Sequence, residues 1–285
     1  MIKAKLRIMR RIREKGKNNL FIFSLALLFN VLVLTSFSNQ IPDSGVDELK
    51  TIVLDAGHGG KDPGCNGADE IWEKEVTLKV VKKLGKLIED SLKDVRVLYT
   101  RETDVFINLW ERPKLANKNN ADLFVSIHCN AHNSDAHGTE TFVLGLHRNA
   151  SNFRIAQQEN EVIFMEDNYE QNYEGFDPSS PESFIGLTLL QEDYLDQSIL
   201  LARTIQNNFM QKLKRRDRGV KQAGFWVLHN TYMPSVLVET GFITNKKEGD
   251  YLNSNRGKEE ISNSIFDAII DYKSSLNSDV TFENP

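Results

Sequence analysis

Cysteine is scarce in this sequence, and its scarcity limits what can hold the fold together. Only Cys65 and Cys129 are present among 285 residues. Two thiols do not make the disulfide framework on which small secreted domains depend. We interpret both as small packing residues, and the sequence leaves open whether they pair.

The chain also lacks an excess of positive charge and any internal repeat. Its 35 Lys and Arg residues are outnumbered by 40 Asp and Glu residues, which gives a net charge of −5. Without a broad basic surface, we expect no nucleic-acid partner. No second domain is visible, and the length is sufficient for one sizeable domain with a good core.

Basic residues are concentrated at the N-terminus. Residues 1–17 hold eight Lys and Arg residues, and the apolar run 20–34 follows them. This order is typical of a secretory signal. We therefore predict a signal peptide over 1–38, a polar linker over 39–50, and export to the periplasm or cell envelope. An uncleaved inner-membrane anchor is the alternative, although the apolar run is short for a full span.

From residue 51 onwards, β-prone runs alternate with amphipathic stretches. Strands are predicted near 51–54, 95–100, 123–127, 138–144, 225–228 and 236–239, and helices near 74–91, 110–119, 197–214 and 261–272. This alternation predicts one α/β domain over 51–276, with a mostly parallel twisted sheet and helices on both faces. The polar residues 277–285 are expected to form a frayed tail.

Two histidines stand directly after predicted strands. His58 lies in the glycine-rich turn of TIVLDAGHGGKDPG, and His128 ends the apolar run of ADLFVSIHCNA. Open α/β sheets bind ligands at the carboxyl ends of their strands. A carboxylate near the start of the following helix, from Glu70, Glu73 or Glu75, can reach the same edge. Two histidines and one glutamate are a known ligand set for catalytic zinc, which keeps a position open for water, whereas structural zinc is usually closed by cysteines.

A further strand ends in a carboxylate that suits proton transfer. In SVLVETGFITN, residues 235–245, the apolar run is followed by Glu239. Such a carboxylate could take the proton from a metal-activated water. The remaining histidines lack a supporting constellation and are interpreted as loop or surface residues; they are His132, His137, His147 and His229.

Four segments together carry a family resemblance. LDAGHGGKDPG, EKEVTL, ADLFVSIHCNA and LVETGFITN, in this order and spacing, resemble the zinc-dependent N-acetylmuramoyl-L-alanine amidases of the amidase-3 type, which are bacterial cell-wall enzymes. The match runs from about residue 51 to about residue 275. The resemblance implies a sheet of six strands and one zinc ion (Zn2+) per chain. It selects Glu73, because the family has a glutamate followed directly by lysine, and it implies His58, Glu73 and His128 as metal ligands with Glu239 as the catalytic base.

The resemblance also implies the reaction. It predicts a secreted hydrolase that cleaves the amide between N-acetylmuramic acid and L-alanine in peptidoglycan, in cell-wall remodelling or daughter-cell separation. The residues themselves support metal-dependent hydrolysis, while the identity of the bond comes from the resemblance. The alternatives are another cell-wall zinc peptidase, such as a carboxypeptidase, and a peptidoglycan-binding protein without catalysis. The intact Glu239 argues against the second alternative.

Several polar residues near these segments have two interpretations each. Asp55 and Glu140 are predicted either to orient a metal-bound imidazole or to bond to a nearby loop backbone. Asn130 is expected either to contact substrate amides or to cap a turn. Arg101 and Arg112 resemble arginines of the family, and salt bridges within the fold explain them at least as well as substrate binding.

Residues 155–202 contain no Lys or Arg at all. We interpret about 155–196 as an insertion. Long insertions in compact domains are often functional lids. In cell-division amidases of this family, an insertion at this place carries a helix that covers the zinc until a partner displaces it. We therefore hypothesise a lid whose carboxylate fills the open zinc position and whose apolar stretch 184–190 faces a protein activator; a plain surface excursion is the alternative. Three glutamates are candidates for that carboxylate: Glu166, Glu174 and Glu182.

Overall fold

The computed structural model describes residues 48–67, 70–146, 150–173, 175–187 and 192–276. The predicted signal peptide or anchor, most of the predicted linker, the C-terminal tail, Glu174 and part of the apolar stretch 184–190 lie outside the described residues. Among the helices that are described, none is long and apolar enough to cross a membrane.

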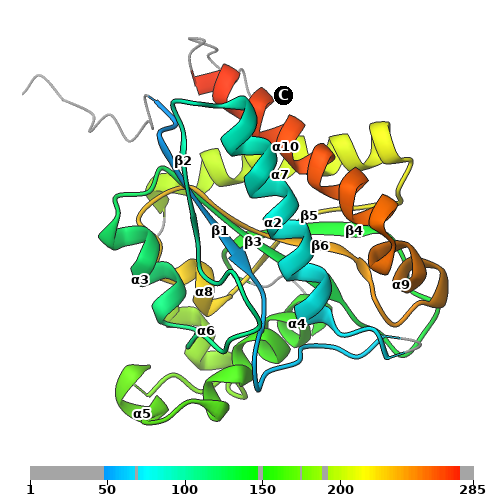
Figure 1. The fold of residues 1–285 in the computed structure, drawn as a ribbon. Coiled ribbons are helices and arrows are strands. Elements are labelled where there is room, and N and C mark those ends of the chain that lie inside the picture. Colours follow the sequence, from blue (N-terminus) through cyan, green and yellow to red (C-terminus); the bar gives the residue numbers. More distant parts are fainter. Residues whose placement is uncertain (1–47, 68–69, 147–149, 174, 188–191, 277–285) are drawn as a thin grey trace, which may run out of the picture. The chain divides into compact units, whose positions relative to one another are not determined.

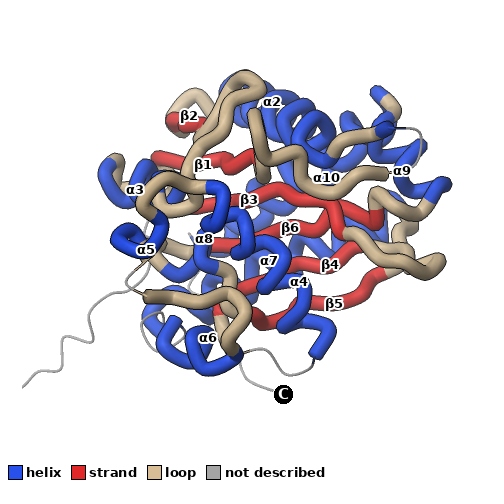
Figure 2. Tube along the Cα trace, turned by 90° about the horizontal axis from the view of Figure 1, so that it is seen from below, coloured by secondary structure: helices blue, strands red, loops and turns tan. Residues whose placement is uncertain are grey.

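A six-stranded sheet forms the centre of the domain, with the strand order β2-β1-β3-β6-β4-β5 (Figure 2). The strands are β1 (Thr51–Ala56), β2 (Arg96–Tyr99), β3 (Leu123–Asn130), β4 (Thr139–Leu144), β5 (Asp217–Ala223) and β6 (Ser235–Phe242). β2, β1, β3 and β6 run parallel, β4 is antiparallel to β6, and β5 is parallel to β4. The predicted mostly parallel sheet of six strands is confirmed.

Helices cover both faces of this sheet, as predicted (Figure 1). One face packs against α2 (Glu73–Ser91), α7 (Glu192–Leu213) and α10 (Asn255–Leu276). The other face packs against α3 (Glu111–Lys118), α8 (Trp226–His229), and a continuous segment made of α4 (Ala150–Asn160), the 3-10 helix η2 (Glu161–Met165), α5 (Tyr169–Asn172) and α6 (Pro181–Leu187). α9 (Lys246–Asn253) follows β6 and leads into α10.

Two hydrophobic cores lie on opposite faces of the sheet, and β3 contributes to both. Val125, Ile127 and Cys129 belong to the core beneath α2, α7 and α10, whereas Phe124 belongs to the core beneath α3, α8 and α4. Because side chains alternate along a strand, His128 shares the face of Phe124 and lies opposite Cys129. The two cysteines are free thiols, so both act as packing residues.

The prediction of a strand at 225–228 is wrong. Trp226–His229 forms the short helix α8, and the strand lies earlier, at Asp217–Ala223. The apolar residues 225–228 are buried in the second core as part of a helix instead of a strand. There the rings of Tyr173 and Phe176 contact Trp226. β5 is an edge strand that is only partly buried, and edge strands commonly carry charged residues instead of an apolar run.

The pairing of β3 with β6 contains an irregularity beside the site. His128 is paired with Glu239, and Asn130 with Phe242, so two steps along β3 match three along β6. The extra residue in β6 is accommodated around Gly241, whose φ of +147° favours glycine. Such bulges occur next to active sites, where they redirect side chains; this one brings Phe242 opposite Asn130.

Candidate active site

The three predicted metal ligands meet above the carboxyl ends of β1 and β3. His58 Nε2 lies 3.2 Å from Glu73 Oε2, and His128 Nδ1 lies 3.3 Å from Glu73 Oε1. The two imidazole rings are 4.9 Å apart, centroid to centroid. With Glu159, these residues form a group whose candidate ligand atoms all lie within 4.8 Å of one another.

The glycine-rich turn allows the two imidazoles to approach. His58 has a φ of +61°, a left-handed conformation that is uncommon outside glycine and often marks functional sites. A Cβ at position 57 would lie 2.5 Å from the ring of His128, so only glycine fits there. Two buried arginines hold the turn by its carbonyl oxygens: Arg101 donates to Ala56 and Gly57, and Arg112 donates to Ala56 and His58. Both arginines therefore support the turn from within the fold.

Each ligand side chain is fixed by a further hydrogen bond or ion pair. Asp62 Oδ2 lies 2.8 Å from His58 Nδ1, so Nε2 is the nitrogen turned toward the site. Glu73 accepts one backbone N–H on each carboxylate oxygen, from Cys65 at 2.9 Å and from Cys129 at 2.8 Å. Carboxylates that orient metal-binding imidazoles are common in metal sites. The sequence reasoning missed Asp62, although an acid four residues after the histidine in one turn is a usable signal.

Neither Asp55 nor Glu140 bonds to an imidazole, so the structure corrects that expectation. Asp55 is fully buried beneath the turn and Glu140 lies on β4, facing β5. The partners of Asp55 are Thr100, Arg112 and Ser126, and those of Glu140 are Asn130, Arg218 and Lys221. Arg112, Ser126 and Thr100 outweigh the cost of burial and lower the pKa of Asp55, so this carboxylate is a charged anchor for the arginine below the turn. Asn130 donates its Nδ2 to Glu140, and its Oδ1 accepts the backbone N–H of Ala131 in the loop that follows β3.

Glu159 is a second residue that sequence reasoning missed. Its Oε2 lies 3.0 Å from His128 Nδ1 and 3.4 Å from His58 Nε2. The structure thus corrects the choice of glutamate, because neither Glu166 nor Glu182 reaches this place. Glu166 Oε1 instead accepts the backbone N–H of Leu109 and the hydroxyl of Tyr173, and Glu182 bonds to Ser180 in solvent. The usable signal was that Glu159 is the one acidic residue of the stretch that forms α4, ASNFRIAQQEN.

Glu239 lies beside this group with both carboxylate oxygens buried. It is paired with His128 in β3 and with Glu140 in β4, and neither of its oxygens has a hydrogen-bond partner among the described residues. Burial raises the pKa of Glu239 well above its usual range, and the charge of Glu159 raises it further, against an opposite effect of His128. A buried carboxylate without a partner, next to a candidate metal site, is suited to proton transfer.

The residues present fit a divalent cation. His58 Nε2, His128 Nδ1 and Glu159 Oε2 are buried, and within the described part of the chain they have no hydrogen-bond partner. Burial alone lowers the pKa of His58, but the carboxylates of Glu73, Glu159 and Asp62 together raise it well above its usual value. The group therefore favours positive charge between the rings. Two imidazole nitrogens with carboxylate oxygens are a donor set that zinc takes.

The model of the N-acetylmuramoyl-L-alanine amidase family, Amidase_3, matches residues 52–271. The chain belongs to this family. The amidase is 33% identical over 227 residues to the N-acetylmuramoyl-L-alanine amidase AmiA of Escherichia coli, covering 78% of this chain and 76% of that one. It is also 34% identical over 226 residues to the uncharacterised protein YqiI of Bacillus subtilis, covering 79% and 85%.

Solved structures share the fold of the amidase. An N-acetylmuramoyl-L-alanine amidase from Clostridium difficile superposes with a TM-score of 0.60 at 27% identity, covering 80% of this chain and 98% of that one. The CwlD amidase of Clostridioides difficile, solved in complex with the GerS lipoprotein, gives a TM-score of 0.59 at 28% identity, covering 79% and 99%.

Proposed function

We propose that this amidase is an exported zinc hydrolase of peptidoglycan. Family membership gives the bond, the amide between N-acetylmuramic acid and L-alanine, and a role in cell-wall remodelling. The observation that carries the metal is the meeting of His58, Glu73 and His128 at one point, where the two ring nitrogens beside Glu73 are buried and have no hydrogen-bond partner among the described residues. Export to the periplasm or cell envelope rests on the basic and apolar N-terminal segment, and one relative is named a cell wall amidase.

His58, Glu73 and His128 would hold the zinc. When bound there, zinc supplies a Lewis acid for the scissile carbonyl and lowers the pKa of a water toward about 7. Glu239 would accept the proton of the attacking water and then donate it to the nitrogen of the departing L-alanine. Asp62 would keep His58 in one tautomer, and the two backbone N–H groups on Glu73 would fix its carboxylate.

Digestion of purified sacculi tests this function. Mass analysis should find muramic acid with a free lactyl carboxylate and stem peptides with a free L-alanine amine. A chelator should abolish both products, and added zinc should restore them. Release of terminal amino acids would instead indicate a carboxypeptidase, and tight binding to sacculi without products would indicate a wall-binding protein.

We propose in addition that Glu159 holds the site closed. Catalytic zinc needs a position open to water or substrate, and the carboxylate of Glu159 lies 3.0 Å and 3.4 Å from the two ring nitrogens that face that position. An activator protein would act on the insertion that carries α4 and so free the position. The structurally similar CwlD amidase forms a complex with a lipoprotein, which is a precedent for protein partners in this family.

Glu159→Ala tests the closed state. The variant should hydrolyse sacculi at least about tenfold faster, because a charge-assisted ligand contact contributes roughly 1.5–3 kcal/mol. Zinc content should stay the same. Glu161→Ala is the matched control, since this exposed carboxylate lies two residues further along and has no contact with the imidazoles. An unchanged rate in Glu159→Ala would show that the glutamate does not restrict access.

A further inference from the structure

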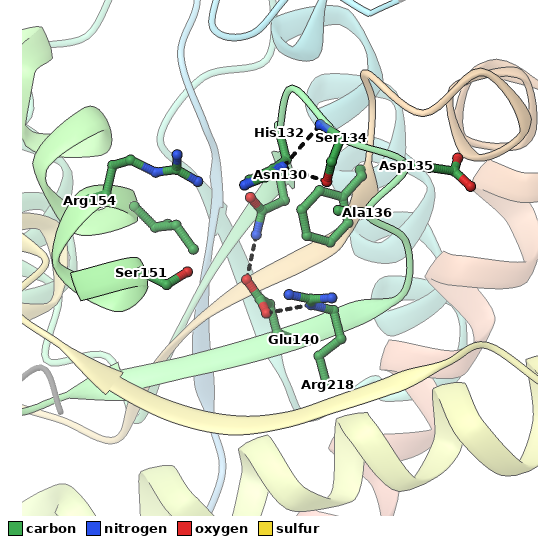
Figure 3. Close-up of a pocket in the computed structure, with 11 residues that line it drawn as sticks. Asn130, His132, Ser134, Asp135, Ala136, Glu140, Ser151, Arg154 and Arg218 are labelled. Atoms are coloured by element: carbon green, nitrogen blue, oxygen red, sulfur yellow. Dashed lines mark hydrogen bonds and ion pairs between the residues drawn. The ribbon is translucent and has the colours of Figure 1, made fainter. Parts of the chain in front are cut away.

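A cavity of about 440 Å³ is lined by Asn130 and Glu140 (Figure 3). Asn130 follows His128 by two residues in β3, and Glu140 is paired with Glu239, so the cavity lies beside the group formed by His58, Glu73, His128 and Glu159. Asn130, Glu140 and Phe242 line it from the sheet, and Arg218 closes it from β5. Arg154 extends into it from α4. The cavity therefore lies next to the scissile position and has an arginine on each of two walls.

Glu140, on the wall of the cavity, is paired with two cations of β5, of which Arg218 also lines the cavity. Glu140 Oε2 accepts from Arg218 Nε at 2.9 Å and also from Lys221 Nζ. One carboxylate is thus shared by two cations. The guanidinium of Arg218 also lies 4.8 Å from the centre of the Phe242 ring, which holds it in place.

Arg154, from α4, adds a second cation to the lining. Within the described part of the chain, Arg154 has no ion pair or hydrogen bond. Asp135 is the other acid on the cavity wall, but its side chain points away from the cavity and accepts from Asn245 at 2.6 Å. The chemistry of the cavity accordingly suits an anion, and planar guanidinium groups match a carboxylate best.

α4 is anchored well enough to keep Arg154 in place when Glu159 moves. Ile155 and Ala156 are buried in the second core. Asn160 is clamped at the end of the helix, where its Nδ2 donates to Gly224 O and its Oδ1 accepts from Trp226 N, each at 2.9 Å. A rotation of the Glu159 side chain can clear the metal position while the helix stays on the sheet.

The distance between His128 and the cavity suits an extended dipeptide. Asn130 follows His128 by two residues in β3, which places it about 7 Å further along the strand. An extended dipeptide spans about the same length. We propose that this cavity is the subsite for the free carboxylate of the residue that follows L-alanine in the stem peptide, held by Arg154 and Arg218. The proposal rests on the proposed amidase function and adds a preference for an acidic over an amidated second residue.

Two substrates that differ only in the α-carboxylate of the second residue test the proposal: N-acetylmuramoyl-L-alanyl-γ-D-glutamyl-L-lysine and its counterpart in which that α-carboxylate is amidated, so that the third residue occupies the γ-carboxyl in both. The parent amidase should prefer the acid by about tenfold in kcat/KM, the effect of one charge-assisted hydrogen bond. Arg154→Ala should remove most of this preference through a higher KM for the acid, and Arg154→Lys should retain part of it. Arg256→Ala, which removes an exposed charge from α10, should leave the preference unchanged.

Equal kcat/KM values for the two substrates, or a preference that survives in Arg154→Ala, would contradict the subsite. Binding of L-alanyl-γ-D-glutamyl-L-lysine and of its α-amide, measured by calorimetry on the parent and Arg154→Ala, tests the subsite without turnover. The parent should bind the acid more tightly, and equal binding of the two peptides would overturn the proposal. Failure of the parent to release stem peptides from sacculi would contradict the proposed function separately.

Discussion

Glu239 and Glu73 are both fully buried carboxylates near the same two imidazoles, yet their surroundings give them different chemistry. Glu73 accepts a backbone N–H on each oxygen and faces both histidines, which lower its pKa well below the usual value despite burial. Glu239 has no hydrogen-bond donor among the described residues, and burial raises its pKa. The first carboxylate is thereby held in its anionic form, as the proposed ligand role requires, and the protonated form of the second is favoured, as the proposed proton transfer requires.

Glu239→Gln should keep the metal and lose almost all turnover. Glutamine preserves the volume of the side chain but has no basic oxygen, and loss of a general base typically costs about 10²–10⁴ in rate. Zinc content by elemental analysis and hydrolysis of sacculi measure the two effects. A rate within a few-fold of the parent would mean that another group accepts the proton.

At the level of elements, the segment between β4 and β5, proposed above to close the site, is also part of the second core. Tyr173 and Phe184 from this segment are buried with Trp226 of α8. Tyr173 also donates its hydroxyl to Glu166, whose other partner is the backbone N–H of Leu109. Removal of 167–182 would therefore expose apolar surface of the second core, so point variants test the closed state more cleanly than a deletion.

Asn160→Ala should loosen the end of α4 beside Glu159. The change leaves the buried Gly224 carbonyl and Trp226 N–H without partners, which costs about 1–3 kcal/mol. Unfolding in denaturant should show this loss, and hydrolysis of sacculi should rise several-fold because Glu159 is held less firmly. Gln158→Ala, at an exposed position of the same helix, is the control. A loss of stability at an unchanged rate would indicate that the clamp serves only the core.

On the scale of the whole domain, the metal-binding group connects parts of the chain that are far apart in sequence. His58 follows β1, Glu73 begins α2, His128 lies in β3 and Glu159 lies in α4. An ion bound here would hold a turn, a helix start, a central strand and the insertion together. Ligands that bind only the folded state stabilise it by mass action.

Chelation should therefore lower the melting temperature of the parent. At a free zinc concentration of about 1,000 times the dissociation constant, binding contributes about 4 kcal/mol, and each kcal/mol shifts the midpoint by about 2–4 °C in a domain of this size. Calorimetry with zinc and with a chelator measures the difference. His128→Ala, which lacks one ligand, should show little or no difference between the two conditions. Equal midpoints for the parent would contradict binding of a metal by the folded state.

The sequence by itself determined the features that depend on local pattern. Alternating apolar runs and amphipathic stretches predicted the α/β sheet, because strand and helix periods differ. The glycine-rich turn, the strand-end His128 and Glu239, and the helix start at Glu73 marked the residues that meet at one sheet edge, because parallel strands end on the same side. Only the choice of Glu73 over its neighbours required the family pattern.

The tertiary structure decided what depends on segments that pack across the chain. In the structure Glu159, and neither Glu166 nor Glu182, lies beside the histidines. The hydrogen bonds of Asn160 anchor α4 and so determine which residue of the insertion faces the site. It made 225–228 a buried helix, and it set Glu140 against Arg218 rather than an imidazole. These contacts join residues about 30 to 80 positions apart, and local periodicity carries no information about the register in which such distant segments pack.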